Sequence, residues 1–285
     1  MKPLVTTLLD LSSELPTTPL IVGGGFGLYL QQQRLERRED IDTMIRGDRW
    51  PPARATEDVD LFLPTEVIVS AERARAIREA LDRLGFESIA EHFQFQRVTE
   101  LGTVRLDLLT CDIPKEHADK VKVKGFRVRP LGGVRLHAFL TREALALDLS
   151  PREFLLAGER SDGKAAEARV LVPNAFTYLL MKLHALRDRV DDPTKSRGAH
   201  HAVDIYRIVA MMNRDDYDFV LSQCRVHRRE EVMVAAIDIV REFFGSSSRK
   251  GMLRLLDGAA ATGLPRSTVA AEVLIDTLGE LFQPE

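Results

Sequence analysis

A short apolar run that ends in a glycine turn is the first clear pattern along the chain. Leu20–Val22 is followed by Gly23, Gly24 and Gly25, and an apolar helix face comes directly after them, formed by Phe26, Leu28, Tyr29 and Leu30. An apolar run, small residues and then a helix predict a strand, a tight turn and a helix start. The open N–H groups at such a helix start are suited to binding phosphate.

Strict alternation of polar and apolar residues marks the second pattern. Asp58 and Asp60 alternate with Val59, Leu61 and Leu63. This predicts a half-buried strand with both carboxylates on one face. Adjacent carboxylates repel each other unless a cation lies between them, and Mg²⁺ or Mn²⁺ suits such oxygen ligands. A glycine turn or an Asp-x-Asp strand end is often only structural, but the two together favour metal-assisted nucleotidyl or phosphoryl transfer.

A third carboxylate follows in the next alternating segments. Residues 92–98 and 104–110 both alternate, with a turn at 101–103, and predict a β-hairpin. In its second strand Asp107 shares a face with Arg105. Asp107 therefore either completes the metal site or is a strand residue that faces solvent or pairs with an arginine.

Hydrophobic periodicity divides the rest of the chain into two domains. In the first, helices are expected at 4–15 and 70–84, strands at 126–129, 135–140 and 169–172, and a loop at 158–163 within the mixed stretch 141–168. After Pro173 the pattern is helical throughout, with helices at 176–190 and 199–212 and three more beyond Tyr217. We expect an α+β domain over residues 1–172, a mixed sheet flanked by helices, and an all-helical domain over residues 173–285.

A long polar loop, residues 38–53, directly precedes the Asp-x-Asp strand. Loops of this length are often functional. The loop is either part of a substrate entrance or a solvated insertion.

Composition excludes several classes of protein. With 45% hydrophobic and 29% charged residues the chain is not expected to be disordered, and its net charge of −3 is no global signature for nucleic acid. RNA contact would therefore need a local patch, and the basic runs 225–229 and 249–250 are either solvated helix faces or such patches. Cys111 and Cys224 lie far apart, which indicates no disulfide framework and fits the cytoplasm. Neither a signal peptide nor a membrane span is expected.

The signatures of two other nucleotide-binding motifs are each broken by a single residue. A dinucleotide fingerprint would need glycine at position 28, which is leucine. The P-loop signature fails because Gly163-Lys164 is followed by Ala165. Zinc-ligand spacing and a nucleophile elbow are also missing from the sequence.

Taken in order, the motifs resemble those of the DNA polymerase β-type nucleotidyltransferase superfamily: a strand, a Gly-Gly helix start, Asp-x-Asp and a third aspartate on a nearby strand. The helical half is similar to that of the AbiEii/AbiGii-type nucleotidyltransferase toxins, through KLHALRDR at 182–189 and AVDIYRIV at 202–209. The resemblance covers most of residues 20–212.

This resemblance implies roles for individual residues. Asp58 and Asp60 match the metal-binding pair, Gly23–Gly24 the phosphate-side glycines, Lys182 the family's lysine and Asp204 its later aspartate near the site. On pattern alone, Lys182 would be a surface lysine beside an apolar stripe and Asp204 a helix-surface aspartate. With the resemblance, Lys182 is expected to place a positive charge on a triphosphate.

Two departures from the family pattern affect substrate binding. Gly25 stands where the family often has serine, threonine or another small residue, so one hydroxyl to phosphate would be missing. The later aspartate is often preceded by a Lys-Asp or Arg-Asp pair, whereas this chain has SRGAHHAVD.

The resemblance also implies an activity. We expect transfer of a nucleoside monophosphate from an NTP, with Mg²⁺ or Mn²⁺ and release of pyrophosphate, to a nucleic acid acceptor, the tRNA 3′-end being the expected one. The protein would be the toxin of a toxin–antitoxin or phage-defence pair, with a cognate antitoxin as partner. The alternatives are nucleotidylation of a small antibiotic-type molecule or a protein side chain, and a non-catalytic nucleotide-binding relative.

Overall fold

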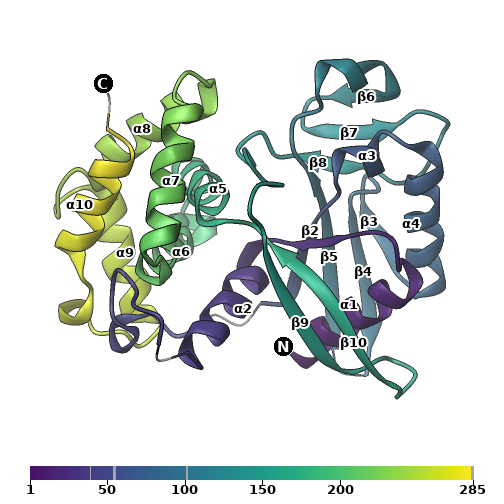
Figure 1. Ribbon diagram of the computed structural model, residues 1–285, viewed down its shortest axis with the longest axis horizontal. Coiled ribbons are helices and arrows are strands. Elements are labelled where there is room, and N and C mark those ends of the chain that lie inside the picture. Colours follow the sequence, from purple (N-terminus) through teal and green to yellow (C-terminus); the bar gives the residue numbers. More distant parts are fainter. Residues whose placement is uncertain (39, 54–55, 101, 284–285) are drawn as a thin grey trace. The chain divides into compact units, whose positions relative to one another are not determined.

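The computed structural model describes residues 1–38, 40–53, 56–100 and 102–283 and folds into two units that interleave along the chain (Figure 1). The first unit comprises residues 1–27, 55–144 and 150–173, and the second residues 28–54, 145–149 and 174–285. Parts of two segments considered above lie outside the described residues, namely Glu39 and Arg54–Ala55 around the long loop and Leu101 in the hairpin turn.

A ten-stranded mixed sheet forms the centre of the first unit. Its strands follow the order β6-β7-β8-β5-β2-β1-β10-β9, and β4 pairs with both β3 and β5. Parallel pairs occur at β1–β10, β2–β5 and β5–β8. The strands are β1 Leu20–Val22, β2 Asp58–Phe62, β3 Glu87–Ala90, β4 Gln94–Thr99, β5 Gly102–Thr110, β6 Val121–Lys124, β7 Arg127–Pro130, β8 Ala138–Leu140, β9 Arg152–Glu159 and β10 Ala165–Val172. The predicted α+β class is confirmed.

Helices cover one face of this sheet and leave part of the other face for polar side chains. The helices of the first unit are α1 Lys2–Glu14, α3 Thr65–Ile68, α4 Ala71–Arg83 and the start of α2 Gly24–Glu36, with the 3₁₀ turn η2 Lys115–Lys120. On the covered face, Phe95 pairs with Leu106 and both side chains are fully buried. Arg78 of α4 lies over the Phe95 ring, which places α4 against this face.

Several short elements differ from the sequence prediction. Strands β3, β6 and β9 and the single turn α3 were not predicted, and β10 begins at Ala165, four residues before the predicted start. The physical reason for missing β9 is its position at the sheet edge, where it pairs only with β10 and buries only Leu156. An edge strand with so little burial carries no strict alternation of apolar residues.

The second unit is built from helices. They are α5 Ala175–Arg187, α6 Ala199–Met211, α7 Arg214–Val226, α8 Glu231–Phe244, α9 Lys250–Ala261 and α10 Ala271–Leu281, with the rest of α2 and the 3₁₀ turns η1 Gly47–Arg49, η3 Pro193–Gly198 and η4 Arg266–Thr268. Within the part of the chain that the structure describes, every helix falls short of the length and apolarity needed to cross a membrane.

Four helices, not the predicted three, complete the C-terminal part, because α9 was missed. Glycines at 251 and 258 weaken its helical signal, since glycine lowers helix propensity by about 1 kcal/mol. For Gly258 the structure gives a reason. A Cβ at Gly258 would lie 2.7 Å from Val203 Cγ2 and 2.9 Å from the Ala199 carbonyl oxygen, so the glycine permits close packing of α9 on α6.

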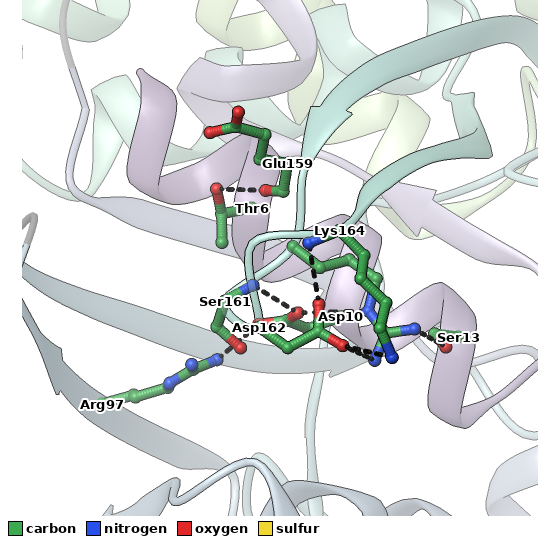
Figure 2. Close-up of polar contacts among 9 residues, drawn as sticks. Thr6, Asp10, Ser13, Arg97, Glu159, Ser161, Asp162 and Lys164 are labelled. Carbon is green, nitrogen blue, oxygen red and sulfur yellow. Dashed lines mark hydrogen bonds and ion pairs between the residues drawn. The ribbon is translucent and has the colours of Figure 1, made fainter.

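A buried carboxylate ties α1 to two distant parts of the sheet (Figure 2). Asp10 is only 1% exposed. Its Oδ2 accepts a hydrogen bond from Arg97 Nη1 at 2.8 Å, and its Oδ1 accepts one from the Ser161 backbone N–H at 3.0 Å. Arg160 lies 3.9 Å from the same carboxylate and donates to Ser13 at 2.8 Å. Thus Asp10 joins β4 and the β9–β10 turn to the first helix.

Replacing Asp10 by alanine should destabilise the protein, because Arg97 would keep a largely buried charge without its partner. We expect a loss of about 3 kcal/mol in the free energy of unfolding, measured by denaturant titration. Glu14→Ala is the matched control, since Glu14 lies on the same helix and pairs with Arg83 at 2.8 Å near the surface. That variant should lose less than about 1 kcal/mol. Equal losses would contradict a structural role for Asp10.

Candidate active site

Two carboxylates face each other across neighbouring parallel strands. The register of β2 and β5 places Asp60 opposite Asp107 and Asp58 opposite Arg105. Asp60 and Asp107 are half-buried, while Asp58 is exposed. Their neighbours Val59, Leu106 and Leu108 are fully buried on the other face. The predicted alternation therefore holds in both strands and gathers acidic side chains on one side of the sheet.

The surroundings of Asp107 make its negative charge costly. The pKa of Asp107 is raised to about 6, first by burial and then by the charge of Asp60, although a hydrogen bond with Gln94 opposes the shift. At neutral pH the group is therefore mostly ionised beside a second carboxylate. A bound cation would relieve this repulsion.

The fit of this site to a metal ion rests on the carboxylates of Asp60 and Asp107. Among the described residues, no set of three or more His, Cys, Asp or Glu side chains is grouped so that it could hold a metal ion. The structure therefore brings Asp60 next to Asp107 but does not gather Asp58 with them into one three-carboxylate site. Mg²⁺ is commonly bound through one or two carboxylates, so Asp60 and Asp107 suit it. Asp58 as a ligand stays a prediction.

The glycine turn lies directly against Asp60. The Gly23 N–H donates to the Asp60 carbonyl at 2.8 Å. Gly24 begins α2 with a φ of +59°, and a Cβ at this position would lie 2.7 Å from Asp60 Cγ. A Cβ at Gly23 would lie 2.7 Å from the Phe62 ring. These positions admit only glycine, so the backbone at the N-terminus of this helix approaches the Asp60 carboxylate closely, with no Cβ between them. Gly25 follows in the first turn of α2 and offers no hydroxyl.

A second cluster of charged groups lies within the helical unit. Lys182 of α5 donates to Asp204 Oδ2 of α6 at 2.7 Å, and Arg207 donates to Asp204 Oδ1 at 2.7 Å. Lys182 is 8% exposed and Asp204 1% exposed. The interpretation from pattern alone, a surface lysine and a surface aspartate, is therefore wrong for both. Among these three groups one carboxylate is shared by two cations.

Arg207 is the member of this cluster that sequence reasoning did not select. Its spacing of three residues from Asp204 on one helix was the available signal, because such residues are neighbours on a helix surface. Arg207 also donates to the Pro52 carbonyl at 2.7 Å, and Tyr206 donates to the Arg49 carbonyl at 3.1 Å. α6 thus holds the end of the long polar loop.

The long loop is not a solvated insertion over its described residues. Ile45 is 3% exposed and Trp50 is 8% exposed. The Trp50 indole donates to the Ile45 carbonyl at 2.7 Å, and the Met44 N–H donates to the Met212 carbonyl at 2.8 Å. Within the second unit the loop therefore has a packed conformation. Its role as a substrate entrance stays a prediction.

The buried cluster allows a test that separates charge balance from other effects. Asp204→Asn should cost about 3–5 kcal/mol of unfolding free energy, because it leaves two buried cations without their carboxylate. Lys182→Met should cost less than about 1 kcal/mol, since Arg207 still neutralises Asp204. Asp218→Asn is the control, because its pair with Arg214 is exposed, and it should change stability by less than about 0.5 kcal/mol. An Asp204→Asn protein as stable as the control would refute the cluster's structural role.

Comparison with known proteins places these features in one family. The sequence model of the nucleotidyl transferase AbiEii toxin family, a type IV toxin–antitoxin system, matches residues 7–261. The match extends over both units and includes every residue from the glycine turn to Asp204. No curated protein and no solved structure matches the chain. The matched segment spans most of the 285 residues. The chain therefore belongs to the AbiEii family of nucleotidyl transferase toxins of type IV toxin–antitoxin systems.

Proposed function

We propose that this nucleotidyl transferase moves a nucleoside monophosphate from an NTP to the 3′-end of a nucleic acid, with tRNA as the acceptor, and releases pyrophosphate. The observation that carries the proposal is the contact of Gly24 with Asp60, which in turn lies opposite Asp107. A helix N-terminus free of side chains and a pair of half-buried carboxylates are together suited to a nucleotide triphosphate with its divalent cation.

The three aspartates of the sheet and the start of α2 each have a role in this proposal. Asp60 and Asp107, with Asp58 at the exposed end of β2, would hold Mg²⁺ or Mn²⁺. The bound ion would supply positive charge to the phosphates as the new bond to the α-phosphorus forms and the bond to pyrophosphate breaks. The N–H groups at the start of α2 would bind phosphate oxygens.

Lys182 and Asp204 act together in this proposal. Lys182 would contact the triphosphate, and Asp204 would hold the ammonium group in place through their 2.7 Å hydrogen bond. Because Arg207 shares the same carboxylate, Lys182 keeps positive charge that an anionic ligand can use. The assignment of Lys182 to the triphosphate rests on the family resemblance.

The biological setting follows from the family. A toxin of a type IV system has a cognate antitoxin as its partner, and we propose that this protein acts in the cytoplasm, where NTPs and tRNA are present. Nucleotidylation of a small molecule or a protein side chain is the alternative within enzymes. A nucleotide-binding relative without turnover is the alternative outside them.

Incubation of the protein with each labelled NTP, Mg²⁺ and total tRNA, followed by a denaturing gel, tests the proposed reaction. Label should appear on tRNA and require the divalent ion. Asp60→Ala and Asp58→Ala should each lower the rate by about 1,000-fold, which corresponds to about 4 kcal/mol. Asp82→Ala on the exposed face of α4 is the control and should retain activity.

The outcomes separate the alternatives. Label on the protein or on a small molecule would retain the chemistry and reject the acceptor. NTP binding without transfer to any acceptor would favour the non-catalytic relative. Full activity in Asp60→Ala would reject the metal assignment.

Gly24→Ala should abolish transfer while the protein still folds, because the new Cβ would push against the Asp60 carboxylate. Gly85→Ala is the matched control. Gly85 also has a positive φ, +76°, but a Cβ there meets nothing within 4 Å. The Gly85→Ala variant therefore introduces the backbone strain of a positive φ, about 1 kcal/mol, without displacing a neighbouring side chain. Equal activity in the two variants would show that the close approach of Gly24 to Asp60 is not needed.

A further inference from the structure

A basic hairpin with an aromatic residue at its tip stands near one end of the sheet order (Figure 1). Strands β6 and β7 have the sequence VKVKGFRVRP, which holds four cationic residues and no acidic one. The register pairs Lys124 with Arg127 and Lys122 with Arg129. Because directly paired residues share a face, the four cationic side chains lie on one side of the hairpin.

This side of the hairpin continues onto the face that carries the catalytic carboxylates. Arg127 pairs with Phe139 of β8, and Phe139 pairs with Leu109 of β5. Leu109 lies two residues after Asp107, and residues two apart in a strand point to the same face. The hairpin's cations, the Phe139 ring and the Asp107 carboxylate are therefore on one face of one sheet.

Three aromatic rings cluster between the cations and the carboxylates. The rings of Phe126 and Phe139 are stacked with centroids 4.8 Å apart and an interplanar angle of 28°. Phe93 meets each of them with centroids 6.0 Å apart. Phe126 is 50% exposed. The cluster therefore presents one largely exposed ring to solvent, stacked on a half-buried one.

Charge around the rings is only partly neutralised. Arg127 is paired with Glu91 at 2.8 Å. Lys122, Lys124 and Arg129 are exposed, and the structure gives them no acidic partner among residues 1–38, 40–53, 56–100 and 102–283. Three cations without an acidic partner, beside a cluster with one exposed ring, favour an anionic ligand with flat apolar groups. The buried core of a protein–protein interface, by contrast, is depleted in charge.

We infer that the Phe93/Phe126/Phe139 cluster and the β6–β7 hairpin bind the single-stranded end of the nucleic acid acceptor, an inference that rests on the proposed function. A base would stack on the exposed Phe126 ring, and the phosphates would follow Lys122, Lys124 and Arg129. Stacking on aromatic rings next to a row of cations is how proteins bind single-stranded nucleic acid without reading duplex grooves.

The order of the strands argues for the acceptor and against the base of the NTP. The glycine turn follows β1, which lies beside β2 on the side away from β5. The aromatic cluster involves β8, which lies beside β5 on the side away from β2. Asp60 and Asp107 therefore stand between the phosphate-binding turn and the rings. This arrangement suits a donor on one side of the carboxylates and an acceptor on the other.

Binding of a short fluorescein-labelled single-stranded RNA, measured by anisotropy without NTP or metal ion, tests the stacking. Phe126→Ala should weaken binding about tenfold, within the range expected for loss of one stacked base. Phe126→Trp should retain the affinity, because it keeps a stacking ring. Phe126→Leu should bind as weakly as the alanine variant, because it keeps an apolar side chain without the ring.

The cations are tested by the salt dependence of the same binding. The double variant Lys122→Gln, Lys124→Gln should reduce the slope of log affinity against log salt by about 1.4, the value for two phosphate contacts on a single strand. Arg73→Gln, Arg75→Gln on α4 is the control. It makes the same change in net charge at two exposed positions on the helix that covers the opposite face, and its slope should be unchanged.

The results decide between the inference and the function on which it rests. RNA affinity unchanged in Phe126→Ala and in the lysine variant, with label still transferred to tRNA by the wild type, would overturn the inference and leave the function intact. A Phe126→Ala protein that loses NTP affinity but not RNA affinity would also overturn it, since the ring would then stack on the donor. Wild-type protein that neither binds RNA nor labels it would reject the acceptor class and the inference together.

Discussion

Repulsion between two carboxylates is the constraint on which the proposed site depends. Asp60 and Asp107 are placed opposite each other by the parallel register of β2 and β5. Neither can move away, because the residues on both sides of them are fixed in the buried face of the sheet. Burial, and after it the charge of Asp60, raises the pKa of Asp107. In the proposed function, a cation bound together with an anionic substrate would relieve this repulsion.

The glycine turn shares this constraint. Because the Gly23 N–H bonds to the Asp60 carbonyl and Gly24 approaches the Asp60 side chain closely, the proposed phosphate site at the start of α2 is located by the same residue that would hold the metal. The opposite face of the sheet is covered by helices. Its side chains pack under α4 and α1, through the contact of Arg78 with Phe95 and the ion pair of Arg97 with Asp10.

In the helical unit the electrostatic constraint is the burial of a charged cluster. Asp204 is buried with two cations, and burial of such groups is tolerated only when each is paired. Arg207 serves both the carboxylate and the Pro52 carbonyl, so the charge cluster and the long loop have a common anchor. Arg207 therefore couples the charge balance of the cluster to the packing of the loop.

Local patterns determined much of this protein. Alternation placed Asp58, Asp60 and Asp107 on strands, the glycines marked the start of α2, and the periodic stripes located α5 and α6, because each of these signals arises within a few residues of chain. The edge strand β9 and the helix α9 were decided by tertiary structure, since edge pairing and close glycine packing leave little periodic signal. Only the fold could show that Asp60 lies opposite Asp107, that Arg207 joins Lys182 at Asp204, and that the hairpin at 121–130 faces the same side as the carboxylates. These relations are between residues distant in sequence, and strand register and helix packing alone bring them together.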